Sequence, residues 1–352
     1  MPDNILLRAA RVAADVITEN AMKNQQVLLA ARPQGAVEES HFRFVETEIP
    51  RAGEGQFVVR AHYLSLDPYM RGRMDDAKSY AKKAQVGEVM VGTAVGEVIE
   101  SRHPKFAAGD FVETRTGWQL YGVSDGGGAR RIDPAFVPIT AYLGAVGMPG
   151  VTAWIGLNEF GKPQSGETVV VSAASGAVGS AAGQLAKLKG CHVIGIAGGK
   201  AKCEYVVDEL GFDACIDYKA GRLDADLAAA CPRGIDVYFD NVGGTVLDAV
   251  LLEANAFARV VICGQISGYS QPDALAIRNA RALLVNRIAL RGFICSDHLE
   301  LWRPALKELG QLVHDGKLKY RESIVEGLRN APAAFIGLMN GKNFGKQLVK
   351  LV

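Results

Sequence analysis

The sequence of 352 residues has no cysteine before Cys191 and no C-x-x-C pair. Its six cysteines are widely spaced in the second half of the chain, at Cys191, Cys203, Cys215, Cys231, Cys263 and Cys295. The histidines of the first half, His41, His62 and His103, are isolated as well. Even a catalytic zinc site needs three clustered protein ligands, so the sequence predicts no metal site. Unclustered cysteines are typical of small buried side chains in a reducing compartment.

An excess of charge of either sign is also missing. The formal net charge is +1, which gives no electrostatic reason to expect nucleic acid or an anionic membrane surface as the main partner. One uncharged run, residues 134–158, is long enough to cross a bilayer. Pro134, Pro138 and Pro149 break this run into turns and a short helix. We interpret it as the buried seam between two domains, and the sequence predicts no membrane span.

No secretory signal is visible at the N-terminus. The residues before Met22 include Arg8, Arg11, Asp15 and Glu19, and the two acidic residues disfavour a transit peptide. We therefore expect residues 1–21 to form an unstructured or weakly helical extension. The expected location of the protein is cytoplasmic.

The length of the chain favours two domains, and the pattern of apolar residues changes between them. The first part reads as short strands bounded by Gly, Pro and Asp, at residues 27–30, 57–64, 94–101 and 111–115. The second part has strands at residues 168–173, 192–197, 214–218, 237–241, 260–264 and 288–294, with helices to residue 189 and over 200–210. Alternation of strands and helices predicts a doubly wound parallel sheet. Strand-like runs return after Ile324, which indicates that the tail rejoins the first domain.

A glycine-containing turn follows the strand expected at residues 168–173. Gly176 and Gly179 match the second and third glycines of the dinucleotide-binding pattern G-x-G-x-x-G, and Ala174 stands at the first position. A small residue at 174 permits the turn, Gly176 lets the backbone approach a pyrophosphate, and Gly179 lets the helix pack on the strand. The phosphates would sit at the N-terminus of that helix. A tight turn that binds nothing is the alternative, and the surrounding βα units favour cofactor binding.

The residues after the second strand of this sheet distinguish between the two nicotinamide cofactors. NAD sites usually place Asp or Glu there, on the ribose 2′-hydroxyl. Here the chain continues Gly-Gly-Lys-Ala-Lys, and the first acidic residue is Glu204, inside the next helix. Lys200 and Lys202 can pair with a 2′-phosphate, and each charge-assisted hydrogen bond contributes about 1.5–3 kcal/mol. The sequence therefore favours NADPH, with two solvated helix lysines as the alternative.

Four motifs in a fixed order resemble one known family. They are Leu66-Asp-Pro-Tyr-Met-Arg71, Ala173-Ala-Ser-Gly-Ala-Val-Gly179, Asp240-Asn-Val-Gly-Gly244 and Cys263-Gly-Gln-Ile-Ser-Gly-Tyr269. Together they resemble the zinc-independent medium-chain dehydrogenase/reductases, in the branch of leukotriene B4 12-hydroxydehydrogenase, 15-oxo-prostaglandin 13-reductase, plant alkenal reductases and bacterial curcumin reductase. The resemblance implies an α/β fold with a Rossmann NADP-binding domain at residues 149–320. It also implies a GroES-like β-barrel catalytic domain split into residues 22–148 and 321–352.

The same resemblance implies NADPH-dependent reduction of the C=C bond of a small apolar enone or enal. It further implies a homodimer paired through Rossmann-domain strands. The pyrophosphate would lie on the turn formed by Ser175, Gly176, Ala177, Val178 and Gly179. The 2′-phosphate would meet Lys202 and Tyr218. The ribose and nicotinamide side would be lined by Asn241, Cys263, Gly264, Gln265, Ile266, Ser267, Tyr269, Phe293, Ile294 and Asn343.

Three features of the chain depart from related patterns. Members of the family begin near Met22, so residues 1–21 lie outside the resemblance. The bacterial branch has Pro-Pro where this chain has Lys82-Lys83, which changes the surroundings of Tyr80 and with them the expected substrate preference. Tyr80 and Trp118 are candidate walls for an apolar substrate, or ordinary core residues. Zinc alcohol dehydrogenases on this fold also carry a Gly-His-Glu segment, which is missing here.

Reduction of an enone needs a hydrogen-bond donor at the carbonyl oxygen, where negative charge builds as hydride arrives. Tyrosine suits this task because its pKa of about 10 keeps it protonated at neutral pH. Tyr269, in a glycine-containing loop after a strand end, is the first candidate, and packing over the cofactor is the alternative. Tyr69 is the second candidate. Its favoured alternative is a structural turn in which Asp67 and Arg71 pair with each other.

Two other functions stay open on the sequence. A quinone reductase of the same superfamily would share the fold, the cofactor and the lack of zinc. A non-catalytic NADPH-binding protein is the second alternative, because the chemistry depends so little on protein side chains. Turnover of enones, compared with that of a benzoquinone, distinguishes the three.

Overall fold

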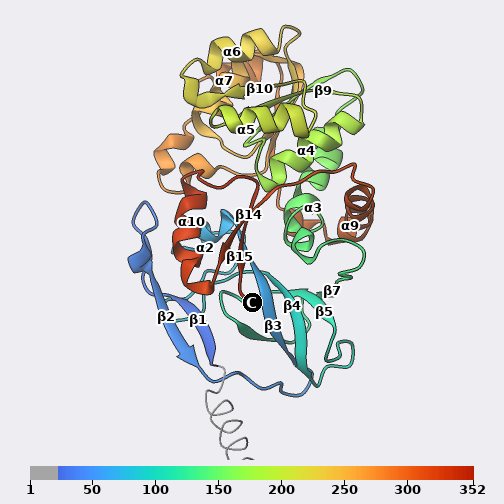
Figure 1. Cartoon of the computed structure of the whole chain (residues 1–352). Coiled ribbons are helices and arrows are strands. Elements are labelled where there is room, and N and C mark those ends of the chain that lie inside the picture. Colours follow the sequence, from blue (N-terminus) through green and yellow to red (C-terminus); the bar gives the residue numbers. More distant parts are fainter. Residues whose placement is uncertain (1–22) are drawn as a thin grey trace, which may run out of the picture.

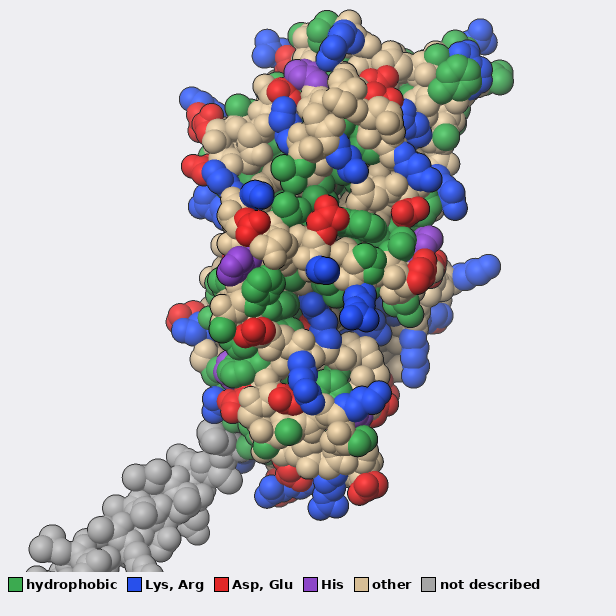
Figure 2. All heavy atoms as spheres, turned by 90° about the vertical axis from the view of Figure 1, so that its right-hand side faces the viewer, with side chains coloured by type: hydrophobic (Ala, Val, Ile, Leu, Met, Phe, Trp, Pro, Cys, Tyr) green, Lys and Arg blue, Asp and Glu red, His purple; other side chains and the backbone are tan. Residues whose placement is uncertain are grey.

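The computed structural model describes residues 23–352, which form two units. The α/β unit is at the top of Figure 1, and the β-rich unit lies below it. The expected extension, residues 1–21, lies outside the described residues, as does Met22. Basic and acidic side chains are intermixed over the face that Figure 2 shows.

The β-rich unit is built around a seven-stranded sheet in the order β14-β15-β3-β4-β5-β7, with β6 paired to β3. Its strands are β3 (Phe57–Leu66), β4 (Ala94–Ser101), β5 (Phe111–Thr114), β6 (Tyr121–Ser124), β7 (Arg130–Arg131), β14 (Glu322–Glu326) and β15 (Lys346–Lys350). A separate antiparallel pair, β1 (Asn24–Leu29) and β2 (Phe42–Thr47), lies beside the sheet. The tail of the chain thus returns to the first unit, where β15 runs antiparallel to β3.

The α/β unit contains a six-stranded sheet in the order β10-β9-β8-β11-β12-β13, and all of its pairs are parallel. Its strands are β8 (Thr168–Ser172), β9 (His192–Ala197), β10 (Ala214–Asp217), β11 (Ile235–Asp240), β12 (Ala254–Ile262) and β13 (Ala289–Gly292). The strand order reverses between β8 and β11, and open α/β sheets bind ligands in the crevice at such a switch point. The expected fold class, a doubly wound sheet with a β domain, is confirmed.

The helices mostly cover the faces of the α/β sheet. They are α2 (Tyr69–Met74), α3 (Met148–Ile155), α4 (Ala177–Leu188), α5 (Lys200–Glu204), α6 (Leu223–Ala230), α7 (Gly244–Leu252), α8 (Arg281–Val285), α9 (Leu299–His314) and α10 (Ala331–Met339). The helix expected over residues 200–210 is only partly α-helical, because a π-helical turn at Tyr205–Glu209 follows α5. The strand expected at residues 192–197 has those bounds in the structure.

The uncharged run, residues 134–158, joins the two units. It forms a 3-10 turn at Ile139–Leu143 and then α3. Tyr142 and Val146 pack in a cluster with strands of the β-rich unit, whereas Val151 and Ile155 pack in the core of the α/β unit. Its apolar composition thus reflects burial at a seam between two cores. Within residues 23–352, no helix combines the length and the apolar character needed to cross a bilayer.

Candidate active site

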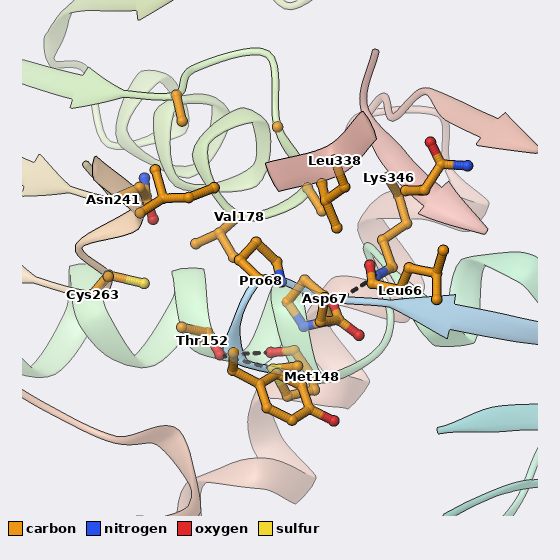
Figure 3. Close-up of a pocket in the computed structure, with 18 of the residues that line it drawn as sticks. Leu66, Asp67, Pro68, Met148, Thr152, Val178, Asn241, Cys263, Leu338 and Lys346 are labelled. Atoms are coloured by element: carbon orange, nitrogen blue, oxygen red, sulfur yellow. Dashed lines mark hydrogen bonds and ion pairs between the residues drawn. The ribbon is translucent and has the colours of Figure 1, made fainter. Parts of the chain in front are cut away.

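A cavity of about 1200 Å³ opens between the two units and takes its walls from both. Figure 3 shows Val178, Asn241 and Cys263 entering from the α/β unit, and Leu66, Asp67, Pro68 and Lys346 from the β-rich unit. A cavity of this size at a domain junction is the usual setting for a cofactor and a small substrate.

The turn between β8 and α4 forms one wall of the cavity. Ala173 adopts a left-handed conformation with φ of 49°, and the N–H of Gly176 donates to the carbonyl of Ala173 at 2.8 Å. A Cβ on Gly179 would lie 2.4 Å from that same carbonyl oxygen, so only glycine permits this approach of helix to strand. The turn therefore brings the start of α4 close to the end of β8, and the first N–H groups of α4 have no partner within the helix.

Two lysines line the cavity near the ends of β9 and β10. Lys202, on α5, donates from Nζ to the carbonyl of Gly341 at 2.7 Å. Burial lowers the pKa of Lys202, and the positive charge of Lys219 lowers it further. Tyr218 lines the same corner and packs against Gly198, where a Cβ would be 2.9 Å from its ring. We call Lys202, Tyr218 and Lys219 the lysine corner.

We expected Lys200 to lie beside Lys202 and to pair with a 2′-phosphate, but in the structure it lies elsewhere. Its side chain is 88% exposed and lies 3.5 Å from Glu204, one turn along the same helix, and it is not among the residues that line the cavity. Lys219 takes the place expected of Lys200. Lys219 comes two residues after β10, the third strand of this sheet in chain order. That position was the available signal, since neighbouring parallel strands end at the same edge of the sheet.

The ends of β8 and β11 fix the floor of the cavity beside the turn. Asn241 donates from its backbone N–H to Ser172 Oγ at 2.9 Å and from Nδ2 to the Ser172 carbonyl at 2.7 Å. Asp240 Oδ1 accepts from the N–H groups of Val242 and Gly243 at 2.9 and 2.8 Å. Burial raises the pKa of the Asp240 carboxyl. These bonds hold the Asn241 side chain at the cavity with little freedom.

The loop after β12 continues this wall. The N–H of Cys263 donates to the carbonyl of Asp240 at 2.8 Å, which fixes the start of the loop. Most of the expected cofactor-binding residues of this region line the cavity, namely Cys263, Gly264, Ile266, Ser267, Tyr269, Phe293, Ile294 and Asn343. Gln265 does not line it; its side chain lies near Gly243, where a Cβ would be 3.5 Å from Gln265 Cβ.

A segment near the C-terminus touches both halves of the site. Gly345 forms a parallel β-bridge with Gly176 of the turn between β8 and α4, and Asn343 Nδ2 donates to the Gly345 carbonyl at 2.7 Å. The next residue, Lys346, pairs with Asp67 Oδ1 at 2.5 Å and donates to the Leu66 carbonyl at 2.8 Å (Figure 3). Both charged side chains of this pair are more than nine-tenths buried. The sequence reasoning missed Lys346, and no local pattern pointed to it.

The Asp67–Lys346 pair corrects one expectation about the turn that carries Tyr69. Asp67 and Arg71 do not pair with each other: Asp67 takes Lys346 and the Ser65 hydroxyl as partners. Arg71 instead pairs with Asp75 and donates to the Gly35 carbonyl at 2.8 Å. The reason is that Asp67 directly follows β3, where Leu66 pairs with Gln347 of β15 and the preceding Lys346 comes beside Asp67.

The tyrosines of the cavity form a cluster. Burial raises the pKa of Tyr269 to about 12, and the neighbouring Tyr80 and Cys263 contribute to the rise. The guanidinium of Arg73 lies 5.5 Å from the ring centre of Tyr69 and 5.6 Å from that of Tyr80. Burial raises the pKa of Tyr69 as well. These hydroxyls therefore stay protonated, and hence able to donate, well above neutral pH.

The two expected substrate walls have different positions. Tyr80 lines the cavity and is 61% exposed. Trp118 is fully buried, stacks on Phe42 with ring centres 5.3 Å apart and contacts Phe335 edge-on. It belongs to the core of the β-rich unit rather than to the cavity wall. Across residues 23–352, no group of three or more His, Cys, Asp or Glu side chains is arranged to hold a metal ion.

Comparisons with known proteins agree with this architecture. Residues 25–132 match the family model for the N-terminal domain of oxidoreductase, and residues 177–311 match the model described as zinc-binding dehydrogenase. The NADPH-dependent curcumin reductase of Escherichia coli is 45% identical over 95% of this chain and 98% of its own length. The NADP⁺-dependent 2-alkenal reductase of Nicotiana tabacum is 40% identical over 93% and 97% of the two chains. The crystal structure of CurA in complex with NADPH from Vibrio vulnificus superposes with a TM-score of 0.88, at 46% identity over 93% of this chain and 99% of that one.

Proposed function

The chain belongs to the medium-chain dehydrogenase/reductase family, in the branch of the curcumin and 2-alkenal reductases, and on that basis we propose that it reduces the C=C bond of α,β-unsaturated ketones or aldehydes with NADPH. The predicted family is confirmed, and so is the prediction of an NADPH-dependent oxidoreductase. The observation that best supports the finer proposal is the single cavity in which a phosphate-binding turn, a pair of lysines and a cluster of protonated tyrosines meet.

The cavity residues fit NADPH by their chemistry. Gly176 would let the backbone approach a pyrophosphate, and Gly179 lets α4 pack closely at the end of β8, because a Cβ there would lie 2.4 Å from the Ala173 carbonyl oxygen. In the lysine corner, Lys202 and Lys219 offer two positive charges to a 2′-phosphate. The nearby Asp217 carboxylate accepts hydrogen bonds from the N–H groups of Gly199 and Lys219. Asn241 and the loop after β12 would line the ribose and nicotinamide side.

When bound, NADPH supplies a hydride for the β-carbon of the substrate. The task left to the protein is to orient the substrate and to stabilise the negative charge that builds on its carbonyl oxygen. We expect Tyr269 to donate a hydrogen bond there, because it lines the cavity and its raised pKa keeps the hydroxyl protonated. A preorganised donor of this kind is worth about 3–4 kcal/mol of barrier lowering. The resulting enolate then takes a proton at the α-carbon.

The enzyme assay that tests the proposal follows NADPH oxidation with a panel of enones and enals and with a benzoquinone. Turnover of the enones, with saturated product formed, is the expected result. Preferential turnover of the quinone would replace the proposal with a quinone reductase. Tight binding of NADPH without turnover of any substrate would indicate a non-catalytic NADPH-binding protein.

We also propose that two copies of the chain associate through the β13 edge of the α/β sheet. β13 is the last strand in the sheet order, and all four of its residues are exposed. Leu284 and Val285, on the preceding α8, are 80% and 50% exposed, and Leu290 on β13 is 37% exposed. Exposed strand edges flanked by apolar side chains pair readily with another chain.

A further inference from the structure

Two of the six cysteines face each other beside the lysine corner. Cys203 lies on α5 and Cys215 on β10, and their Sγ atoms are 2.8 Å apart. A disulfide bond is about 2.05 Å long, so the sulfurs need to approach by less than about 1 Å to form one. Gly195 of the adjoining strand makes room for this pair, since a Cβ there would lie 3.3 Å from Cys215 Sγ.

The chemistry of the two thiols differs in a way that suits oxidation. A hydrogen bond from the Cys215 thiol lowers the pKa of Cys203, whereas the same contact, together with burial, raises the pKa of Cys215. Both cysteines are half-buried, so a small oxidant can reach them. A thiolate, not a thiol, is the nucleophile in such reactions, which makes Cys203 the attacking residue and Cys215 the resolving one.

We propose that Cys203 and Cys215 form a reversible disulfide that weakens the binding of NADPH. With hydrogen peroxide as the oxidant, the Cys203 sulfur attacks one peroxide oxygen, the O–O bond breaks, and a sulfenic acid and water form. Cys215 then attacks the sulfur of the sulfenic acid, the S–O bond breaks, and a second water leaves with the thiol proton. The two thiols lose two electrons, and the peroxide gains them.

The effect on the cofactor follows from the neighbours of the two cysteines. Lys202 immediately precedes Cys203, and Lys219 follows Cys215 on the segment that leaves β10. Asp217 holds this segment to the start of α5 by accepting from the N–H groups of Gly199 at 2.7 Å and Lys219 at 3.0 Å. A disulfide draws α5 toward β10 and narrows the lysine corner. The room for a phosphate group between the two lysines then decreases.

Peptide mapping tests the disulfide itself. Lys202 and Lys219 are consecutive trypsin sites, so the tryptic peptide of residues 203–219 carries both cysteines and no others. After treatment with hydrogen peroxide and then iodoacetamide, we expect this peptide to be lighter by two hydrogen atoms and free of alkyl groups. Dithiothreitol should restore double alkylation. A peptide that still carries two alkyl groups after peroxide would overturn the proposal.

Steady-state kinetics with both cofactors tests the consequence, which rests on the proposed place of the 2′-phosphate. Oxidation should raise the KM for NADPH by roughly threefold or more and change the KM for NADH less, because only NADPH carries the 2′-phosphate. A Cys203–Cys215 disulfide that forms without a change in the KM for NADPH would overturn the proposal that it weakens NADPH binding. Turnover of enones by the reduced enzyme is measured separately. A failure of the proposed function is therefore distinguishable from a failure of the proposed disulfide to change NADPH binding.

Two cysteine variants test whether the response to peroxide depends on Cys215. Cys215→Ser cannot form the disulfide, so its KM for NADPH should not respond reversibly to peroxide. Cys231→Ala is the matched control, because Cys231 is a buried cysteine of the same unit, and this variant should respond like the parent protein. A response that persists in Cys215→Ser would assign the effect to another residue and overturn the proposal.

Discussion

Lys202 and Tyr269 carry the most specific expectations for single residues, because we propose a distinct task for each in the same cavity. Lys202 is tied to the Gly341 carbonyl and shares its corner with Lys219. Tyr269 shares its surroundings with Tyr80 and Cys263, and its hydroxyl is hydrogen-bonded by the backbone of Gln265. One residue therefore bears on the choice of cofactor and the other on the chemical step.

Replacing Lys202 by alanine should weaken the binding of NADPH far more than the binding of NADH. The lost charge-assisted hydrogen bond is worth about 1.5–3 kcal/mol, or roughly ten- to hundredfold in KM for NADPH. Initial rates at varied NADPH and NADH measure the difference. Lys200→Ala is the matched control, since Lys200 lies on the same helix but pairs with Glu204 outside the cavity. Equal losses for both cofactors in Lys202→Ala would refute the phosphate assignment.

Replacing Tyr269 by phenylalanine should lower kcat on an enone by about tenfold or more, because it removes a donor to the developing negative charge. The KM for NADPH should change little. Tyr320→Phe provides the control: burial also raises the pKa of Tyr320 to about 12, but this residue does not line the cavity. An unchanged kcat in Tyr269→Phe would remove this tyrosine from the chemical step.

The pH dependence of kcat gives an independent test of Tyr269. A phenol donates only while it is protonated, and burial raises the pKa of this one to about 12. The donor should therefore persist above pH 10, where an ordinary tyrosine is half ionised. We expect kcat to stay level between about pH 8 and pH 10. A fall by half near pH 10 that is missing in Tyr269→Phe would show an unshifted pKa.

Among the elements, the junction of β8 and α4 is the most tightly constrained. The helix begins at Ala177, Gly179 in its first turn packs against the carbonyl of Ala173, and Ala173 has a left-handed conformation. The segment from Gly341 to Lys346 then lies against this junction and against the end of β3. A displacement of α4 would therefore disturb the cofactor site and its contact with the β-rich unit together.

Gly179→Ala should be more damaging than Gly176→Ala. A Cβ at position 179 would meet the Ala173 oxygen at 2.4 Å, whereas a Cβ at position 176 would meet it at 3.1 Å. Overpacking of backbone against backbone typically costs about 1–3 kcal/mol. Urea denaturation measures the loss of stability, and the KM for NADPH reports the shift of the helix. Equal stability of the two variants would contradict this account of the turn.

At the scale of the whole molecule, the β-rich and α/β units meet around the cavity and along the uncharged seam. Tyr142 and Val146 pack with the first unit, and Val151 and Ile155 pack with the second. The α/β unit leaves the β13 edge open on a single copy of the described chain. Assembly through this edge would cover the exposed apolar residues of α8 and β13.

The double variant Leu284→Glu/Leu290→Glu should be monomeric at concentrations where the parent protein is dimeric, because two buried charges oppose the contact. Sedimentation equilibrium measures the mass in solution. Leu188→Glu is the control, because Leu188 is 55% exposed at the end of α4, away from the β13 edge in the sheet order. A monomeric parent protein, or a dimeric double variant, would contradict assembly through β13.

The sequence by itself determined the family, the doubly wound sheet and the glycine turn, because these depend on residues that are close together in the chain. It also predicted a lysine in place of an acidic residue after β9. Tertiary structure decided which lysine joins Lys202, since Lys219 comes from a neighbouring strand. It also decided the partner of Asp67, because Lys346 is 279 residues away and reaches it only through the pairing of β15 with β3. Contacts between distant segments also decided the position of Trp118. It is buried against Phe42 and Phe335, and so it does not form part of the cavity wall.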